Sequence, residues 1–550
     1  MPADAPVSLS PSLALTLAFV AALVAGLLLK LWLQSRQIRH VMRHRHAVPE
    51  IFAQHVPLAA HQKAADYTVA KARLGLVEMA LGSAVLLGWT LLGGLDTLHQ
   101  ALLAWLGGGM VQQLALLAAF ALINGVIDLP LTLYQTFVLE QRYGFNQMSL
   151  RLWLADLAKS LLLGALIGLP IAAAVLWLMG SAGGLWWLWA WGLWMGFNLL
   201  LMVVYPVFIA PLFNKFEPLA DASLTARVTA LMQRCGFQAK GLFVMDGSRR
   251  SAHANAYFTG LGSAKRVVFF DTLLKQLSPA EVEAVLAHEL GHFHHRHIVQ
   301  RMVMMFVLSL AGFALLGWLS AQPWFYAGLG VRPSLGLLVP GAPSAPHDAL
   351  ALLLFMLVVP VFTVFLSPLF AQLSRRHEFQ ADAYAMAQAS GADLASALLK
   401  LYEDNASTLT PDPLFVKFHY SHPPRQRAAG AHALPHYRMT SMLKQKDWST
   451  QARRALTAPE LVAKLAQMDG WQLHGDGTDV AITKTFRFDD YHETMAFVNA
   501  VAFIAHTQDH HPDLSVHYNR CVVRFNTHDV GGISDTDIDC AQRVDALLTA

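Results

Sequence analysis

The segment HELGH, residues 288 to 292, contains two histidines and a glutamate whose spacing suits metal-dependent hydrolysis. Residues four positions apart lie on the same face of an α-helix, so His288 and His292 can bind one zinc ion together. Glu289 lies beside them, where its carboxylate can take a proton from a water on the metal. The pattern therefore predicts a zinc site with hydrolytic chemistry.

A catalytic zinc site of this kind needs a third protein ligand and leaves a fourth position for water. The segment SRRHEFQADAYA supplies two carboxylates one helical turn apart, Glu378 and Asp382. We expect Glu378 to bind the metal, and Asp382 to hydrogen-bond a zinc-binding histidine and fix its tautomer. Without the HELGH segment, the same two carboxylates would indicate only an ordinary charged helix face.

Three more histidines follow the motif: His294, His295 and His297. They lie on other helix faces or lack a partner carboxylate, so we interpret them as a solvated, weakly basic helix end at a membrane surface. The helix that carries the motif is expected to begin after Ser278, which can cap it, with Glu281 three residues further on.

The composition of the whole chain indicates a polytopic α-helical membrane protein. Of its 550 residues, 55% are hydrophobic and 14% are charged, which is too apolar for a soluble protein of this length. Seven apolar runs come close to the ~20 residues that cross a bilayer. They cover residues 13–33, 73–93, 111–133, 153–179, 185–210, 302–321 and 348–370.

The distribution of cations predicts the orientation of these spans. The strongly basic segment 34–46 follows the first run, and short basic loops stay in the cytoplasm. We therefore expect the N-terminus outside, the zinc site and the C-terminus in the cytoplasm, and a membrane of the bacterial inner type. A net charge of +3 is too small to indicate a nucleic-acid partner, and no basic and aromatic array suggests one, so we expect none. Three widely spaced cysteines suit a reducing compartment.

The sequence becomes soluble in character near residue 456. We expect a membrane protease over residues 1–438, a linker over 439–455 and a small α+β domain over 456–550. The elements of this last domain are predicted in the order α-β-β-α-β-β-α, with antiparallel hairpins. A capping box, Thr457 with Glu460, begins its first helix.

A second set of histidines lies in this C-terminal part. His510 and His511 stand at the end of a predicted helix, and His528 follows two predicted strands. A compact fold can bring the three together, although exposed loop histidines would give the same pattern. Because no cysteine or carboxylate lies at metal-ligand spacing, we expect acid–base chemistry here and no second zinc ion.

Over about its first 430 residues the chain resembles the CAAX prenyl endoproteases, integral-membrane zinc proteases. Besides HELGH, the resemblance rests on LTLYQTFVLEQRYGFNQMSL, NAYFTGLGSAKRVVFFDTLL, EFQADAYA and YSHPP. It implies seven helices around a water-filled chamber within the membrane, with the zinc near the cytoplasmic side. It also implies a peptide or membrane-protein substrate.

The same resemblance implies roles for residues outside the zinc motif. The segment HANAYFTG would form an edge strand, where Asn255 and the main chain around Ala256 align the substrate by β-augmentation. His422 would donate a hydrogen bond to the tetrahedral intermediate. The family has an arginine six residues after that histidine, but an alanine stands there in this chain, so Arg427 or Arg425 would have to replace it.

From about residue 456 the chain resembles pterin-4a-carbinolamine dehydratase. The shared features are the pair His510–His511 followed by Pro512, and later Tyr518 and the pair Thr527–His528. The resemblance implies that this domain removes water from 4a-hydroxytetrahydropterin, its pterin substrate. His511 and His528 would act as acid and base, while His510 and Asp513 would orient the pterin.

Together these features predict a zinc endopeptidase fused to a 4a-hydroxytetrahydrobiopterin dehydratase. One alternative is a membrane quality-control zinc protease with a non-catalytic tail for dimerisation or regulation. A second is a membrane-anchored dehydratase with an inactive protease half, which the intact Glu289 disfavours. A third is a transporter with a structural zinc, but we see no inverted repeats in the sequence. Any oligomerisation is expected through the C-terminal domain.

Overall fold

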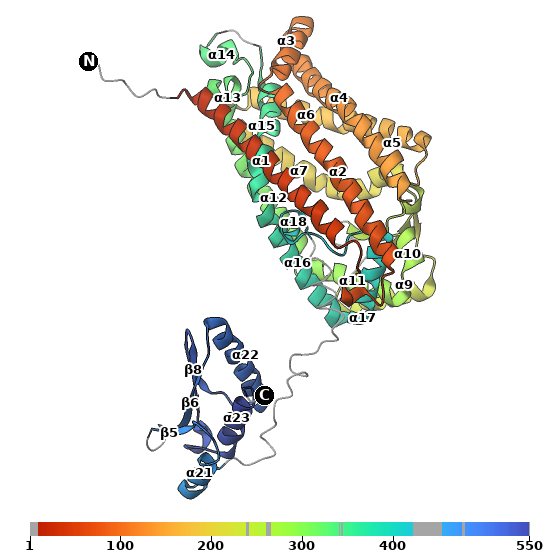
Figure 1. The fold of residues 1–550 in the computed structure, drawn as a ribbon. Helices are drawn as coiled ribbons and strands as arrows, with labels where there is room; N and C mark the ends of the chain where they lie inside the picture. The colour runs from red at the N-terminus through yellow and green to blue at the C-terminus, as the bar shows by residue number, and fades with distance from the viewer. Residues whose placement is uncertain are drawn as a thin grey trace, which may run out of the picture. The chain divides into compact units, whose positions relative to one another are not determined.

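The computed structural model describes residues 9–237, 241–259, 266–339, 341–342, 345–421, 454–475 and 479–548. The chain divides into two compact units, Met1–Ala433 and Leu434–Ala550. Each unit is described by itself (Figure 1). Almost all of the expected linker, 439–455, lies outside the described residues.

Seven helical segments of the described chain are long and apolar enough to cross a membrane, which confirms the predicted count. The last segment is 41 residues long, so its helix continues well past the apolar run that predicted it. The segments are Pro11–Arg43 (α1), Leu58–Trp89 (α2), Met110–Glu140 (including α4, Met110–Tyr134), Leu150–Ser181 (including α5, Leu150–Leu163, and α6, Leu169–Ser181), Gly183–Phe213 (including α7, Trp186–Val204, and α8, Ala210–Phe213), His297–Leu319 (α12) and Asp348–Gln388 (α15, Asp348–Thr363, and α16, Ser367–Gln388).

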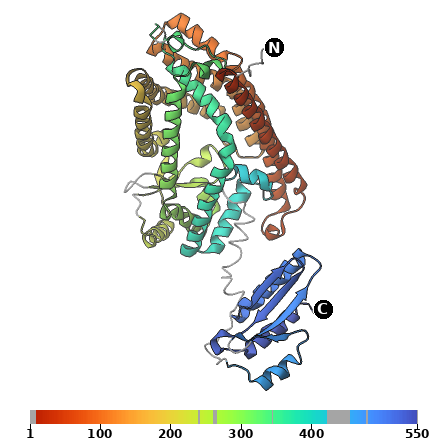
Figure 2. The same cartoon turned by 90° about the vertical axis from the view of Figure 1, so that its left-hand side faces the viewer.

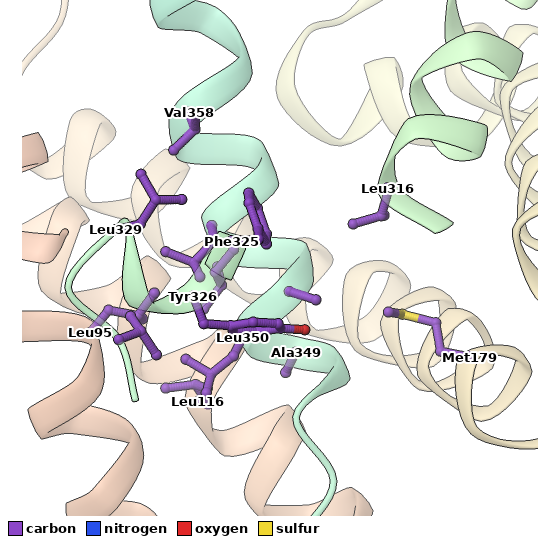
Figure 3. Close-up of a cluster of buried hydrophobic side chains, with 14 of the residues drawn as sticks. Leu95, Leu116, Met179, Leu316, Phe325, Tyr326, Leu329, Ala349, Leu350 and Val358 are labelled. Carbon is purple, nitrogen blue, oxygen red and sulfur yellow. The ribbon is translucent and has the colours of Figure 1, made fainter. Parts of the chain in front are cut away.

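A hydrophobic core joins these helices near one end of the membrane unit, where the short helices α3 (Gly94–Leu106), α13 (Pro323–Ala327) and α14 (Leu335–Leu338) lie (Figure 1). Phe325 and Tyr326 of α13 are buried among side chains of the long helices, including Leu116 of α4 and Leu350 of α15 (Figure 3). The Tyr326 hydroxyl donates a hydrogen bond to the Ser320 carbonyl at 2.8 Å. This satisfied polar group allows a tyrosine to be almost fully buried.

The opposite end of the unit carries a four-stranded sheet and the helices α9 (Ala222–Arg234), α10 (Asp271–Gln276), α11 (Pro279–His294) and α17 (Gly391–Asp404) (Figures 1 and 2). The strands β1 (Phe216–Pro218), β2 (Leu242–Met245), β4 (Arg266–Phe270) and β3 (Ala256–Thr259) lie in the order β1-β2-β4-β3. The buried run from Val267 to Phe269 makes β4 a central strand. β3 pairs antiparallel with β4 and forms an edge of the sheet.

The helix that carries HELGH begins as predicted. Ser278 caps α11, and its hydroxyl accepts a hydrogen bond from the backbone amide of Glu281 while the Glu281 carboxylate accepts one from the Ser278 amide at 2.7 Å. Burial alone would raise the pKa of Glu281, but hydrogen bonds from Lys400, Ser396 and Ser278 outweigh burial and lower this pKa to about 2. These contacts anchor the first turn of α11 to α17.

The C-terminal unit has the predicted element order. The helices are α21 (Ala458–Leu465), α22 (Tyr491–Gln508) and α23 (Asp535–Asp545), and the strands are β5 (Gln472–His474), β6 (Ala481–Arg487), β7 (Asp513–His517) and β8 (Arg520–Phe525). The sheet order is β5-β6-β8-β7, and every pairing is antiparallel. The capping box of Thr457 and Glu460 is present. A core that includes Trp471, Phe486, Phe497 and Phe525 fills this unit, so it has a hydrophobic interior of its own.

Candidate active site

The three predicted metal ligands converge at the junction of α11 and α16. His288 Nε2 lies 3.4 Å from Glu378 Oε2, and His292 Nε2 lies 3.6 Å from Glu378 Oε1. One ligand atom from each side chain lies within 4.8 Å of the other two. Two imidazole nitrogens and one carboxylate are the donor set of a catalytic zinc site with an open position, so these residues fit a zinc ion.

A glycine inside the motif allows the two helices to approach closely enough. A Cβ atom added to Gly291 would lie 2.8 Å from Ala381 Cα and 3.0 Å from the Ala381 carbonyl oxygen. Both atoms belong to the backbone of α16, so they cannot rotate away. The close packing of α11 on α16 places Glu378 opposite the two histidines.

Asp382 occupies the place that its spacing predicted. Its Oδ1 lies 2.8 Å from His288 Nδ1, so the imidazole donates Nδ1–H and keeps the lone pair of Nε2 for a metal. Burial alone would lower the pKa of His288, but its hydrogen bonds to Asp382 and Glu378 outweigh burial and raise this pKa to about 10. The carboxylates around His288 therefore favour a positive charge at this imidazole, which a metal ion bound at Nε2 would supply.

His297 contradicts the prediction that all three following histidines are solvated. It is 1% exposed, its Nδ1 lies 3.0 Å from His292 Nδ1, and its Nε2 lies 2.9 Å from Gln380 Oε1. Because Gln380 Oε1 can only accept, His297 donates from Nε2 and accepts the Nδ1–H of His292. His292 Nε2 is thereby left free to bind a metal.

A single backbone conformation explains why the prediction for His297 was wrong. Arg296 has a φ of 56° and lies in the left-handed region, which ends α11 and starts α12 at His297. The turn directs this imidazole between α11 and α16, where it stacks on His377 with ring centroids 4.1 Å apart. His294 is exposed, as predicted, and His295 is half-buried. A spacing of five residues from His292 does not place two side chains on one helix face, so the sequence carried no local signal for this contact.

Glu289 lies in the same cleft, next to the metal ligands. Burial raises the pKa of its carboxyl group, the neighbouring imidazoles of His288 and His292 act to lower this pKa, and the negative charge of Glu378 raises it further. A carboxylate with a raised pKa, held beside a metal site, suits the role of a general base that takes up and passes on a proton. The geometry therefore agrees with the role that the motif predicted.

A cavity of about 300 Å³ opens in front of these residues. The start of edge strand β3 forms one wall, where Asn255 is exposed and Ala256 follows it. Leu394, Leu398 and Leu401 of α17 line the cavity as well. No motif indicated α17 as a wall, because its leucines follow the ordinary spacing of a helix that packs on a core.

Two predicted residues, His422 and Arg427, lie outside the described residues, as does Arg425. The structure therefore brings together His288, Glu289, His292, Glu378, Asp382, Asn255 and Ala256.

In the C-terminal unit a buried carboxylate connects two histidine-bearing segments. Asp537 of α23 is 0% exposed, and its Oδ1 lies 2.7 Å from His510 Nε2. Its Oδ2 accepts hydrogen bonds from the Thr527 hydroxyl at 2.6 Å and the Ser534 amide at 2.7 Å. Asp537 therefore holds His510 and Thr527 close to each other. The next residue in the chain is His511 in the first case and His528 in the second.

The four predicted residues of this second site differ in exposure. His511, Asp513 and His528 are exposed and can contact a ligand in solution. His510 is 6% exposed, and its ring is bound to Asp537; its expected role in orienting the pterin stays a prediction. Asp537 itself was missed; in the structure it forms a capping box with Ser534 at the start of α23.

Seven helical segments long and apolar enough to span a membrane, together with a His–His–Glu cluster that could hold a metal ion, indicate an integral-membrane metalloenzyme. Residues 37–215 match the family model for the CAAX prenyl protease N-terminal region with five membrane helices, and residues 218–432 match peptidase family M48. The chain belongs to the CAAX prenyl protease family of M48 peptidases.

Two relatives illustrate the extent of this similarity. CAAX prenyl protease 1 of Saccharomyces cerevisiae is 38% identical over 330 residues, in a match that covers 57% of this chain and 70% of the relative. The crystal structure of S. mikatae Ste24p is 30% identical with a TM-score of 0.71, and the match covers 77% of this chain and 99% of that structure. The membrane unit thus has a Ste24-like fold.

The C-terminal unit matches a second family. Residues 454–547 match the model for pterin 4 alpha carbinolamine dehydratase. A putative pterin-4-alpha-carbinolamine dehydratase of Paracidovorax citrulli is 68% identical over 111 residues, which are 20% of this chain and 96% of the relative. The chain therefore joins an M48 metallopeptidase to a pterin carbinolamine dehydratase domain, and the transporter alternative is excluded.

Proposed function

We propose that the membrane unit cleaves peptides of the CAAX type at a single zinc ion held by His288, His292 and Glu378. The convergence of these ligands with Glu289 is the observation that carries the proposal. Zinc, when bound, acts as a Lewis acid toward the scissile carbonyl. Glu289 takes the proton of the attacking water and passes it to the leaving amine.

Other residues hold the substrate and the ligands in place. The open edge of β3 at Asn255 and Ala256 aligns the peptide backbone by β-augmentation. Asp382 keeps His288 in the metal-binding tautomer. His422 donates a hydrogen bond to the tetrahedral intermediate, and Arg427 or Arg425 takes the place of the family's arginine.

The protease half is tested by two variants of the full chain. Glu289→Gln should retain zinc and lose ~10²–10⁴ in cleavage rate, because the ligands remain and the general base is gone. Glu403→Gln, an exposed glutamate of α17, is the matched control and should cleave normally. His292→Ala should lose zinc. Normal cleavage by Glu289→Gln would contradict the mechanism, and stoichiometric zinc in His292→Ala would contradict the ligand set.

For the C-terminal unit we propose dehydration of 4a-hydroxytetrahydropterin, with the exposed His511 and His528 as acid and base and Asp513 as an orienting residue. The residues that precede these two histidines in the chain, His510 and Thr527, both hydrogen-bond to Asp537, which supports this assignment. His511→Ala should slow pterin dehydration by ~10²-fold or more. His474→Ala, an exposed histidine of β5, is the control. An unchanged rate in His511→Ala would leave the tail as a binding or dimerisation module.

We further propose that the protease extends over residues 1–438 and the dehydratase over 456–550, and that both sites face the cytoplasm of a bacterial-type cell. The basic residues that end α1 support this orientation. Reporter fusions at positions 335 and 550 test it, since position 335 should lie outside and position 550 inside. An external signal from position 550 would overturn the orientation.

A further inference from the structure

We propose that Lys71 binds the C-terminal carboxylate of the peptide substrate. This inference rests on the proposed peptidase function and adds the residue that recognises the end of the substrate. Lys71 belongs to α2 and lines a second cavity, of about 650 Å³. Ala254, Asn255 and Asn405 line both this cavity and the metal cleft, so the two spaces adjoin.

The direction of strand β3 indicates which end of a peptide enters the second cavity. β3 runs from Ala256 to Thr259, and within the described residues only β4 pairs with it. A peptide that pairs antiparallel with the open edge has its C-terminal part beside Ala256 and then beside Asn255. Asn255 and Ala254 also line the second cavity, so the C-terminal part of the peptide leads into it.

The length of a CAAX sequence suits this path. Three residues follow the cysteine, and three extended residues span about 10 Å. A cavity of about 650 Å³ is in the ordinary range for binding sites of small ligands, roughly 300–1,000 Å³. Because the two cavities adjoin, three extended residues can lead from the metal cleft into the second cavity, which is bounded by α1, α2 and the segment before β3.

Lys71 is the one side chain with a permanent positive charge among the described residues that line the two cavities. Gln34 of α1, Thr68 of α2 and Ser251 contribute polar side chains to the lining of the same cavity. A carboxylate needs hydrogen-bond donors and a positive charge when it leaves water. The wall around Lys71 supplies both.

The ammonium group of Lys71 is only loosely held by its neighbours. Its Nζ lies 3.4 Å from the Tyr67 hydroxyl oxygen and 4.0 Å from Glu140 Oε1, and 48% of its side chain is exposed. The Tyr67 hydroxyl donates to Glu140 at 2.7 Å, so Glu140 has a closer donor than Lys71. An ammonium has three N–H donors, and this arrangement leaves donors for a substrate carboxylate.

The test compares two prenylated peptides of one sequence, ending in CAAX with a free carboxylate or with an amide. For zinc-loaded wild type, kcat/KM should be about tenfold or more higher for the acid than for the amide. This factor is what the free energy of one hydrogen bond between charged groups would give. In Lys71→Met this ratio should fall to about one, and Lys71→Arg should restore part of it. Arg73→Met removes an exposed charge two residues further along α2, about 200° around the helix, and should keep the wild-type ratio.

The outcomes separate this inference from the proposed function. A Lys71→Met protein that binds zinc and keeps the wild-type ratio would overturn the role of Lys71. Equal cleavage of acid and amide by the wild type would overturn it as well, while leaving the peptidase function intact. If the zinc-loaded wild type cleaves neither peptide, the proposed function fails and this inference fails with it.

Discussion

Replacing Gly291 by alanine should weaken zinc binding without altering any ligand. The added Cβ would lie 2.8 Å from Ala381 Cα, and ordinary contact begins at 3.4 Å, so α11 and α16 must separate by about 0.6 Å. His288 and His292 lie on one of these helices and Glu378 on the other. Metal–ligand distances tolerate only about ±0.2 Å, so the displacement acts directly on the ligand set.

The size of the effect follows from two opposing terms. Overpacking a well-packed interface costs about 1–3 kcal/mol, while alanine gains about 1 kcal/mol over glycine as a helix former. The helix-propensity gain stabilises α11 alone and does not restore the metal geometry. We therefore expect the zinc dissociation constant to rise by ~10–100-fold, since each 1.4 kcal/mol is a factor of ten.

Competition with a chromophoric chelator in detergent measures this constant. Gly312→Ala is the matched control, because the nearest atom to its added Cβ is 4.0 Å away, and it should bind zinc normally. Ala381→Gly in the same chain should not rescue Gly291→Ala, because the clash involves backbone atoms of residue 381. Wild-type zinc affinity in a folded Gly291→Ala protein would refute the reasoning.

Three further predictions follow from buried polar contacts. His297→Ala should weaken zinc binding by ~10–100-fold, as expected for a group that orients a ligand, whereas His294→Ala, at an exposed position, should not; equal affinities by chelator competition would contradict this. Because the pKa of Glu281 is lowered from 4.5 to about 2, its charge stabilises the fold fully above pH 4.5, and this stabilisation is lost as the pH falls toward 2. The stability deficit of Glu281→Gln in chemical unfolding should thus shrink over that interval, and a deficit independent of pH would argue against the ionised contact. Asp537→Asn should destabilise the C-terminal unit by about 3 kcal/mol, seen as earlier thermal loss of dehydratase activity with peptide cleavage retained; an unchanged melting temperature would refute the role of that carboxylate.

Local patterns in the sequence were sufficient to predict the elements and most of the metal site. The i,i+4 spacing of His288 and His292 depends only on helix geometry, and the capping boxes at Ser278 and Thr457 depend only on neighbouring residues. The apolar runs predicted seven spans because a bilayer imposes a fixed length. Each of these features needs no knowledge of tertiary structure.

Features that depend on contacts between distant segments could not be predicted in the same way. The burial of His297 depends on the left-handed conformation of Arg296 and on the position of Gln380, 83 residues further along the chain. The leucine wall of α17 becomes part of the cleft because α17 packs on α11, through a shared hydrophobic core and through the contact of Glu281 with Lys400. No short window of sequence contains both members of such a pair.

Both units contain the same kind of contact, and it illustrates the difference between features encoded locally and features that depend on distant segments. A buried carboxylate from a later helix fixes an imidazole, as Asp382 of α16 does for His288 and Asp537 of α23 does for His510. Asp382 was found from sequence because it lies four residues after the metal ligand Glu378, so one helix face links it to the site. Asp537 lies 27 residues after His510, with no ligand beside it to indicate a site. A carboxylate that orients a histidine can thus be recognised from sequence only when a second, recognisable residue shares its helix face.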